Sequence, residues 1–261
     1  MADELLGAAL EIARAAGALA AARFAAGAPV RRKPDGTEVT PADVEVERLI
    51  RGMVAERFPD DGTLGEEEGE VAGTTGRRWV IDPINGTMLF ARQDPGFNVL
   101  LSVEERGEPV ASVIAYPITG QICYASRGGG AWRRVGDGSP EPLRVSDRRQ
   151  LHGSGVQGLN IGTWSEELLL ALHREVFLLP PVEALAVYRG EAVALVIAGF
   201  PMDYSDVAPL PLLIGEAGGR VTDLRGGDVL TGPGHVLASN GHLHDELLDL
   251  VRDLPLGRRT R

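Results

Sequence analysis

The stretch Trp79-Val80-Ile81-Asp82-Pro83-Ile84-Asn85-Gly86-Thr87 decides the fold of this chain. Its apolar, β-branched start predicts a buried strand, which delivers the carboxylate of Asp82 at its C-terminal end. Pro83 and the Gly86-Thr87 pair then turn the chain. A second informative segment runs from Asp206-Val207-Ala208 to Glu216-Ala217-Gly218-Gly219, and together the two segments form the pattern considered below.

The composition is that of a globular protein with an acidic surface. The chain has 261 residues, of which 44% are hydrophobic and 24% charged, enough for one compact unit or two closely packed halves. The formal net charge is −11, with acidic residues spread along the chain. This charge argues against non-specific nucleic-acid binding, which requires clustered Lys and Arg. A phosphate site would obtain its positive charge locally, from metal ions or helix N-termini.

The number of cysteines and the N-terminal residues indicate in which cellular compartment we expect the protein. Cys123 is the only cysteine, so an intramolecular disulfide and a multi-cysteine zinc site are both excluded. We expect it to be a buried strand thiol. The N-terminal Met1-Ala2-Asp3-Glu4 lacks the basic region of a signal peptide. No apolar run approaches the ~18 residues of a membrane span. The sequence therefore predicts a soluble, cytoplasmic protein with no membrane partner.

The first half, residues 1–147, reads as two helices followed by strands. Apolar residues at helical spacing predict a first helix over 4–25. Thr40, Pro41 and Asp43 predict the start of a second helix, with Thr40 as N-cap, that ends near Phe58. Strands are expected at four apolar segments separated by Gly and Pro turns: residues 78–84, 97–105, 109–116 and 121–125.

The second half, residues 148–261, changes to alternating α/β order. Strands are expected near residues 153–161, 219–223 and 236–239. Helices are expected near residues 164–175, 189–199, 206–217 and 242–252. No internal repeat or low-complexity linker separates the halves, so we expect them to pack as one unit with the site between them.

Acidic residues in three dispersed segments offer ligands for a hard divalent cation. Mg²⁺ prefers oxygen donors in near-octahedral geometry, usually a few carboxylates with water and phosphate. Glu66 and Glu67 follow a glycine, Asp82 ends a strand near the Ile84 carbonyl, and Asp206 starts a helix. Each also has an ordinary structural interpretation: an acid pair in a solvated loop, a turn, or a helix cap.

The conjunction of these segments resembles the inositol monophosphatase family of Mg²⁺-dependent, lithium-sensitive phosphatases. The segments occur in the family's order and cover essentially the whole chain: Lys33 to Asp43, Gly65-Glu66-Glu67, Asp82 to Thr87, Asp206 to Gly219, and Ala238-Ser239-Asn240-Gly241 with His244-Asp245. The resemblance implies a layered αβαβα sandwich of the α/β class, with an N-terminal antiparallel sheet, a smaller C-terminal α/β half, and metals at their junction. It also implies a homodimer.

The resemblance further implies a role for each matching residue. Glu66 and Asp82 would hold a first metal, assisted by the Ile84 carbonyl, and Asp82, Asn85 and Asp206 would surround a second. Thr87 and Asp43 would orient and deprotonate the attacking water, with Glu67 close by and Lys33 near the entrance. The N–H groups of Gly86 and Thr87 would receive phosphate oxygens at a helix start. The reaction would be an in-line displacement assisted by the metals.

Asn85 is the first departure from the family, which has Asp at this position. An amide oxygen can coordinate Mg²⁺, but it carries no charge and accepts no proton, so the second metal should bind more weakly. Three explanations remain open. The residue is natural and gives a slow phosphatase, or it belongs to changed or lost chemistry, or it was introduced to trap a substrate complex.

Two further departures lie in the expected substrate pocket. Residues 200–205 form a shortened strip before Asp206, in which Asp203 could replace the family's polyol-contacting acid or simply lie in a surface turn. The family's sugar-contacting turn has no clean counterpart near Gly190, where Arg189 and Glu191 could line a reshaped pocket. These changes argue that inositol phosphate itself is not the substrate.

The sequence leaves three readings of function. The leading one is Mg²⁺-dependent hydrolysis of a small phosphate monoester of a sugar, polyol, nucleotide or amino alcohol. The second is a different metal-assisted reaction of a phosphorylated metabolite, such as elimination or cyclisation. The third is a binding protein weakened in catalysis. His235, His242 and His244 suggest another metal site, but we expect them in surface loop and helix-cap positions.

Overall fold

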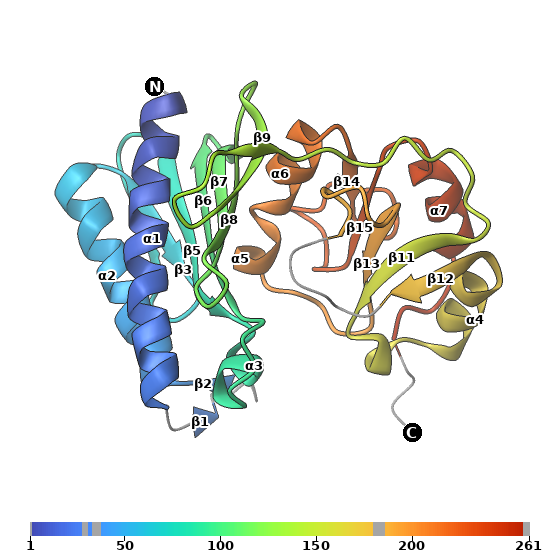
Figure 1. The fold of residues 1–261 in the computed structure, drawn as a ribbon, viewed down its shortest axis with the longest axis horizontal. Helices are drawn as coiled ribbons and strands as arrows, with labels where there is room; N and C mark the ends of the chain where they lie inside the picture. The colour runs from blue at the N-terminus through green and yellow to red at the C-terminus, as the bar shows by residue number, and fades with distance from the viewer. Residues whose placement is uncertain (1, 28–30, 33–37, 180–185, 258–261) are drawn as a thin grey trace. The chain divides into compact units, whose positions relative to one another are not determined.

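The chain folds into two compact units, each with its own sheet and hydrophobic core. The computed structural model describes residues 2–27, 31–32, 38–179 and 186–257. The units are Met1–Glu141 and Pro142–Arg261 (Figure 1).

The first unit is built on a sheet of eight strands in the order β10-β9-β8-β7-β6-β5-β3-β4. The pairs from β5 to β9 are antiparallel, as is β3 with β4, whereas β3 and β5 run parallel. The strands are β3 (Gly62–Gly65), β4 (Gly69–Val71), β5 (Arg77–Asn85), β6 (Asn98–Glu105), β7 (Glu108–Tyr116), β8 (Gln121–Ser126), β9 (Gly130–Val135) and β10 (Glu141–Pro142). Two short strands, β1 (Arg31–Arg32) and β2 (Glu38–Val39), pair separately.

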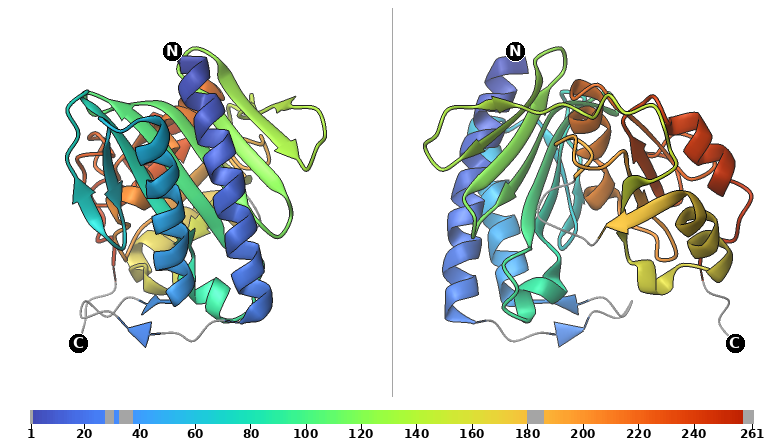
Figure 2. Two further views of the ribbon diagram at one scale, coloured as in Figure 1. Left: turned by 90° about the vertical axis from the view of Figure 1, so that its left-hand side faces the viewer. Right: turned by 45° about the vertical axis from the view of Figure 1, so that its right-hand side comes forward.

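Helices α1 (Ala2–Ala26) and α2 (Pro41–Arg57) lie side by side on one face of this sheet (Figure 2). α1 packs on β6, β7 and β8, and α2 packs on β5. A short helix, α3 (Thr87–Ala91), follows β5 directly. Burying the apolar faces of both helices against the sheet supplies the main stabilisation of this unit.

The helix α1 has one property that the sequence analysis overlooked. The segment Glu4–Ala26 is long and apolar enough, by length and composition, to cross a membrane. Charged residues interrupt this alanine-rich segment, so it contains no unbroken apolar run of that length. Seven of its residues belong to the hydrophobic core of the unit: Leu5, Ala8, Ala9, Ile12, Ala13, Ala16 and Ala20. This burial is what a core helix packed on a sheet requires.

The second unit contains a five-stranded mixed sheet in the order β12-β11-β13-β15-β14. β11 runs parallel to β12 and β13, whereas β15 is antiparallel to β13 and β14. The strands are β11 (Ser154–Leu159), β12 (Val176–Leu179), β13 (Ala194–Ile197), β14 (Arg220–Thr222) and β15 (Val236–Ser239). Helices α4 (Glu166–Glu175) and α7 (His244–Val251) contribute to one core cluster, and α6 (Leu210–Glu216) packs on β14 and β15.

Most predicted elements are present, including the capping box of Thr40 and Asp43 at the start of α2. The predicted helix over 189–199 is wrong, because residues 194–197 form the central strand β13. A strand buried on both faces is a short continuous apolar run, and its periodicity cannot be told from that of a buried helix. The predicted helix over 206–217 is interrupted, since α5 (Tyr204–Val207) ends before Pro209 and α6 begins after it.

Candidate active site

The parallel pairing of β3 with β5 brings two acidic residues, Glu66 and Asp82, to the same end of these neighbouring strands. Gly65 lies opposite Ile81, and the N–H of Glu66 donates to the Ile81 carbonyl over 3.1 Å. Glu66 and Asp82 therefore leave the carboxyl ends of neighbouring parallel strands. Asp82 is 1% exposed, and Glu66 is half-buried. Carboxylates that leave neighbouring strands at the same end repel each other if they approach, and a bound cation would relieve that repulsion.

Strand β5 becomes irregular directly after Asp82 and ends at Asn85. The Asp82 Oδ1 accepts the N–H of Ile84 over 3.1 Å, so the carboxylate stabilises this irregular segment. The pairing of β5 with β6 shifts between Asp82 and Asn85, at Pro83, and resumes where Asn85 lies opposite Asn98. The irregularity adds one residue to β5 relative to β6 between Asp82 and Asn85.

Asn85 is held by a residue that the sequence analysis did not identify. The Asn85 Nδ2 donates to the Asn98 Oδ1 over 3.3 Å, from the first residue of β6. This bond assigns the nitrogen of the Asn85 amide to Asn98 and leaves the opposite atom, Oδ1, as the acceptor. The pairing could have been found only from the register of the β5–β6 pair.

Asp43 and Thr87 are joined by a hydrogen bond between the starts of two helices. The Thr87 hydroxyl lies 3.1 Å from the Asp43 Oδ1 and 3.3 Å from the Ile84 carbonyl oxygen. The other carboxylate oxygen, Oδ2, accepts the Thr40 N–H over 2.8 Å and the Thr40 hydroxyl over 2.5 Å. Asp43 is thus both a helix cap and a partner of Thr87.

Burial raises the pKa of Asp43 above its usual value, although hydrogen bonds from Thr40 and Thr87 act in the opposite direction. The side chain is fully buried. A carboxylate that is more basic than normal is a better proton acceptor near neutral pH. Together with Thr87 it forms a pair suited to moving a proton.

Gly86 sets the direction of α3. Its φ of 88° lies in the left-handed region, where glycine is favoured, and an added Cβ would lie 3.2 Å from Leu89 Cδ1. Gly86 is the N-cap of α3 and uses no side-chain cap. The helix starts at Thr87, so the N–H groups that the sequence assigned to phosphate lie at its first turn.

Most of the remaining predicted residues belong to the second unit. Asp206 and Asp203 form a reciprocal capping box on α5, with the Asp203 N–H donating to the Asp206 Oδ2 over 2.9 Å. Arg189 and Glu191 form an ion pair of 2.6 Å. Glu67 lies in the loop after Glu66. Lys33 lies outside the described residues.

The donor set fits a hard divalent cation. Glu66 and Asp82 offer carboxylates, Ile84 a main-chain carbonyl and Asn85 an amide oxygen, all of which are ligands that Mg²⁺ accepts. No group of three or more His, Cys, Asp or Glu side chains that could hold a metal is found in the described part of the chain.

The histidines of the C-terminal segment were partly misjudged. His244 is fully buried and not on the surface, with its Nδ1 2.8 Å from the Ser239 hydroxyl and its Nε2 3.0 Å from the Thr222 hydroxyl. Burial, assisted by Arg220, lowers its pKa to about 4. The residue is a neutral bridge within the second unit.

Comparison with known proteins identifies the family of this chain. A model of the inositol monophosphatase family matches residues 1–256. The histidinol-phosphatase of Mycobacterium tuberculosis is 35% identical over 251 residues, covering 92% of this chain and 95% of that protein. The inositol-1-monophosphatase of Rhizobium meliloti is 32% identical over 224 residues and covers 82% of each chain.

Solved structures show the same fold. The extragenic suppressor protein suhB of Bartonella henselae matches with a TM-score of 0.84 at 26% identity, over 96% of this chain and 99% of that one. An IMPase of Thermotoga maritima matches with a TM-score of 0.83 at 26% identity, over 96% and 97%. These matches confirm the predicted α/β fold class. The chain is therefore a member of the inositol monophosphatase family and a phosphoric monoester hydrolase.

Proposed function

We propose that this phosphatase uses Mg²⁺ to hydrolyse a small phosphate monoester. The observation that carries the proposal is the register of β3 on β5, which brings Glu66 and Asp82 together within one unit. The hydrogen bond between Thr87 and Asp43 lies in the same unit, and Thr87 follows Asp82 by only a few residues. Cation ligands and a proton acceptor are therefore supplied by neighbouring segments.

We propose as ligands of the cation Glu66, Asp82, the Ile84 carbonyl, Asn85 and Asp206. When bound, a divalent cation lowers the pKa of water and stabilises the charge of a leaving alkoxide. The role of the chain is to fix these oxygens. Burial of Asp82 and its bond to the Ile84 N–H restrict the carboxylate to one orientation.

Thr87 and Asp43 would handle the proton of the attacking water. The Thr87 hydroxyl donates to Asp43, so the lone pairs of its oxygen are available to accept a hydrogen bond from water. As the water attacks phosphorus, its proton passes to the Thr87 oxygen while the Thr87 proton passes to Asp43. The raised pKa of Asp43 favours this acceptance. Glu67 lies in the same loop as Glu66 and would assist.

The phosphate would contact the N–H groups of Gly86 and Thr87 at the start of α3, with Lys33 near the entrance. Arg189, Glu191 and Asp203 would line the part of the pocket that receives the alcohol. The Arg189–Glu191 ion pair partly compensates both charges, whereas Asp203 lies exposed at the N-cap of α5.

Among small esters we propose an amino-alcohol phosphate, with histidinol phosphate as the first substrate to test. Relatives named histidinol-phosphatase from Mycobacterium tuberculosis and Streptomyces coelicolor are 35% and 36% identical to this chain. An exposed acid such as Asp203 would attract a protonated amine more than a neutral polyol. The departures at Arg189 and Glu191 support a substrate other than inositol phosphate.

The test is phosphate release from histidinol phosphate, inositol 1-phosphate and a sugar phosphate, each with Mg²⁺ and with chelator. We expect the highest kcat/KM on histidinol phosphate, and no turnover in chelator. The Asn85→Asp variant should be faster and should need less Mg²⁺, because it restores the charge of a ligand. Absence of phosphate from every ester with both versions would contradict hydrolysis and favour elimination, cyclisation or binding. The cytoplasmic location remains a prediction. The homodimer also remains a prediction, and light scattering would measure it.

A further inference from the structure

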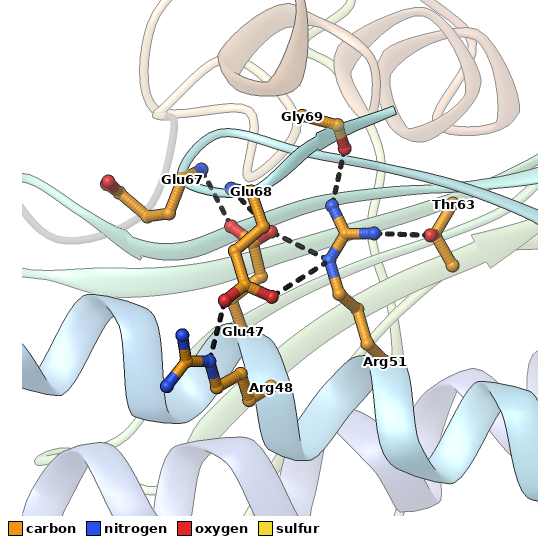
Figure 3. A network of polar contacts seen from close by, with 7 residues as sticks. All are labelled: Glu47, Arg48, Arg51, Thr63, Glu67, Glu68 and Gly69. Atoms are coloured by element: carbon orange, nitrogen blue, oxygen red, sulfur yellow. Dashed lines mark hydrogen bonds and ion pairs between the residues drawn. The ribbon is translucent and has the colours of Figure 1, made fainter. Parts of the chain in front are cut away.

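A buried carboxylate outside the predicted ligand set supports the loop that carries Glu66. Glu47 lies on α2 and its side chain is fully buried, which is costly for a charged group without partners. Its Oε2 accepts the N–H of Glu67 over 2.7 Å, and its Oε1 accepts the N–H of Glu68 over 3.0 Å. Figure 3 shows the carboxylate directed at these two main-chain groups.

The loop in question is the connection between β3 and β4. Gly65 pairs with Gly69 across the two strands, so Glu66, Glu67 and Glu68 form a three-residue hairpin loop. The main chain at Glu66 is held from one side by the bond to Ile81. Glu47 holds the next two residues from the other side. The main chain on both sides of the Glu66 side chain is therefore fixed.

Arg51 supports Glu47 in turn. It lies one helical turn further along α2 and donates from Nε to Glu47 Oε1 over 2.8 Å. Its remaining nitrogens donate to the Thr63 hydroxyl and to the Gly69 carbonyl, so the guanidinium ties both strands of the hairpin to the helix (Figure 3). The positive charge compensates the buried carboxylate.

The Glu47 carboxylate is packed closely against Gly65. A Cβ added at Gly65 would lie 2.0 Å from the Glu47 Oε1 and 2.7 Å from the Arg51 Nη2. The carboxylate thus occupies the space that any other residue at position 65 would need. The two loop N–H groups and the arginine are all hydrogen-bond donors, which a carboxylate with two acceptor oxygens satisfies.

We propose that Glu47 is a positioning residue that fixes the Glu66–Glu68 loop and thereby sets the affinity of the site for its divalent cation. The inference rests on the proposed function, because Glu66 is a ligand only if the enzyme uses the cation. Partners that orient metal ligands typically change metal affinity by about 10- to 100-fold when they are removed.

The decisive variant is Glu47→Gln, which keeps the shape but replaces one acceptor oxygen by an NH₂ that cannot accept a loop N–H. Glu45→Gln is the matched control, since Glu45 lies on the same helix and pairs with Arg23 at the surface. Two quantities are measured on the full chain: hydrogen exchange of the Glu67 and Glu68 amides, and the dissociation constant of Mg²⁺ by calorimetry.

We expect Glu47→Gln to lose amide protection at Glu67 and Glu68 and to raise the Mg²⁺ dissociation constant about 10- to 100-fold. Glu45→Gln should change neither quantity. If Glu47→Gln does not fold, Arg51→Lys loosens the same carboxylate and should give a smaller shift in the same direction. Unchanged Mg²⁺ affinity in a folded Glu47→Gln protein would overturn the inference and leave the proposed function intact. Failure of the wild-type chain to bind Mg²⁺ would instead overturn the proposed function, and the link to the cation with it.

Discussion

The Asn85 amide donates from Nδ2 to the Asn98 Oδ1 over 3.3 Å, across the first pair that β5 and β6 form after their irregularity. The two faces of an amide differ, because one atom donates and the other accepts. With its nitrogen engaged by Asn98, Asn85 presents its oxygen on the opposite side. A carboxylate at position 85 would need no such partner, since both of its atoms accept.

Replacing Asn98 should therefore weaken cation binding through Asn85. In Asn98→Leu the acceptor is lost, the Asn85 amide can rotate, and its NH₂ can face the cation. We expect the Mg²⁺ concentration that gives half-maximal activity to rise about tenfold, the order of effect seen when a partner of a metal ligand is removed. Phosphate release measured against Mg²⁺ concentration checks this.

Two comparisons isolate that orientation effect. Asn98→Asp keeps an acceptor for the Asn85 NH₂, so it should retain most of the Mg²⁺ affinity that Asn98→Leu loses. In an Asn85→Asp background the loss of Mg²⁺ affinity caused by Asn98→Leu should shrink. Both oxygens of a carboxylate can bind the cation, so rotation of the group has no effect. Equal losses in both backgrounds would mean that Asn98 acts on packing and not on the amide.

Asp43→Asn should separate catalysis from folding. The amide keeps the shape and can still accept from Thr40, so the cap of α2 should be retained and Tm should change little. It accepts no proton, however, and kcat at saturating Mg²⁺ should fall by roughly 10²- to 10⁴-fold. A kcat close to wild type would remove Asp43 from the proton path.

The strands and helices of the first unit were predictable because their signals are local. The capping box of Thr40 and Asp43 and the apolar run before Asp82 each specify one element within a few residues. The acids Glu66 and Asp82 could be selected as candidates for the same reason. Their adjacency could not, since it follows from the parallel register of β3 on β5, which pairs segments that are distant along the chain.

Residues that act through long-range contacts were missed. Glu47 lies four residues after Asp43 on the buried face of α2, and two acids on an apolar helix face are a signal that could have drawn attention to it. Asn98 carries no such signal. Residues 194–197 were assigned to a helix because an alanine- and valine-rich run has no period of its own, and only the neighbouring strands decide its form.

Two glycines, Gly65 in β3 and Gly52 on α2, allow a test of the packing around Glu47. Gly65→Ala places a Cβ 2.0 Å from the Glu47 Oε1, so the carboxylate must move and unfolding free energy should fall by about 1–3 kcal/mol. Gly52→Ala is the control, because Gly52 is an exposed helical residue with no atom within 4 Å of an added Cβ. It should gain about 0.5–1 kcal/mol from helix propensity. Urea unfolding of both variants measures the two signs, and a neutral Gly65→Ala would contradict the close packing at the loop.

His244 should make the stability of the chain depend on pH. Burial lowers its pKa in the folded state to about 4, whereas in the unfolded chain it stays near its ordinary value of 6.5. Between these values the unfolded state binds the additional proton, so stability is fully present above about pH 6.5 and is lost as the pH falls towards 4. The full effect is about 3 kcal/mol.

In His244→Gln the lost packing lowers stability at every pH, but this part of the pH dependence should disappear. His173→Gln, at an exposed position on α4, should leave it unchanged. Urea unfolding at pH 7 and pH 5 tests this, and an unchanged difference between the two pH values in His244→Gln would assign the dependence to other groups.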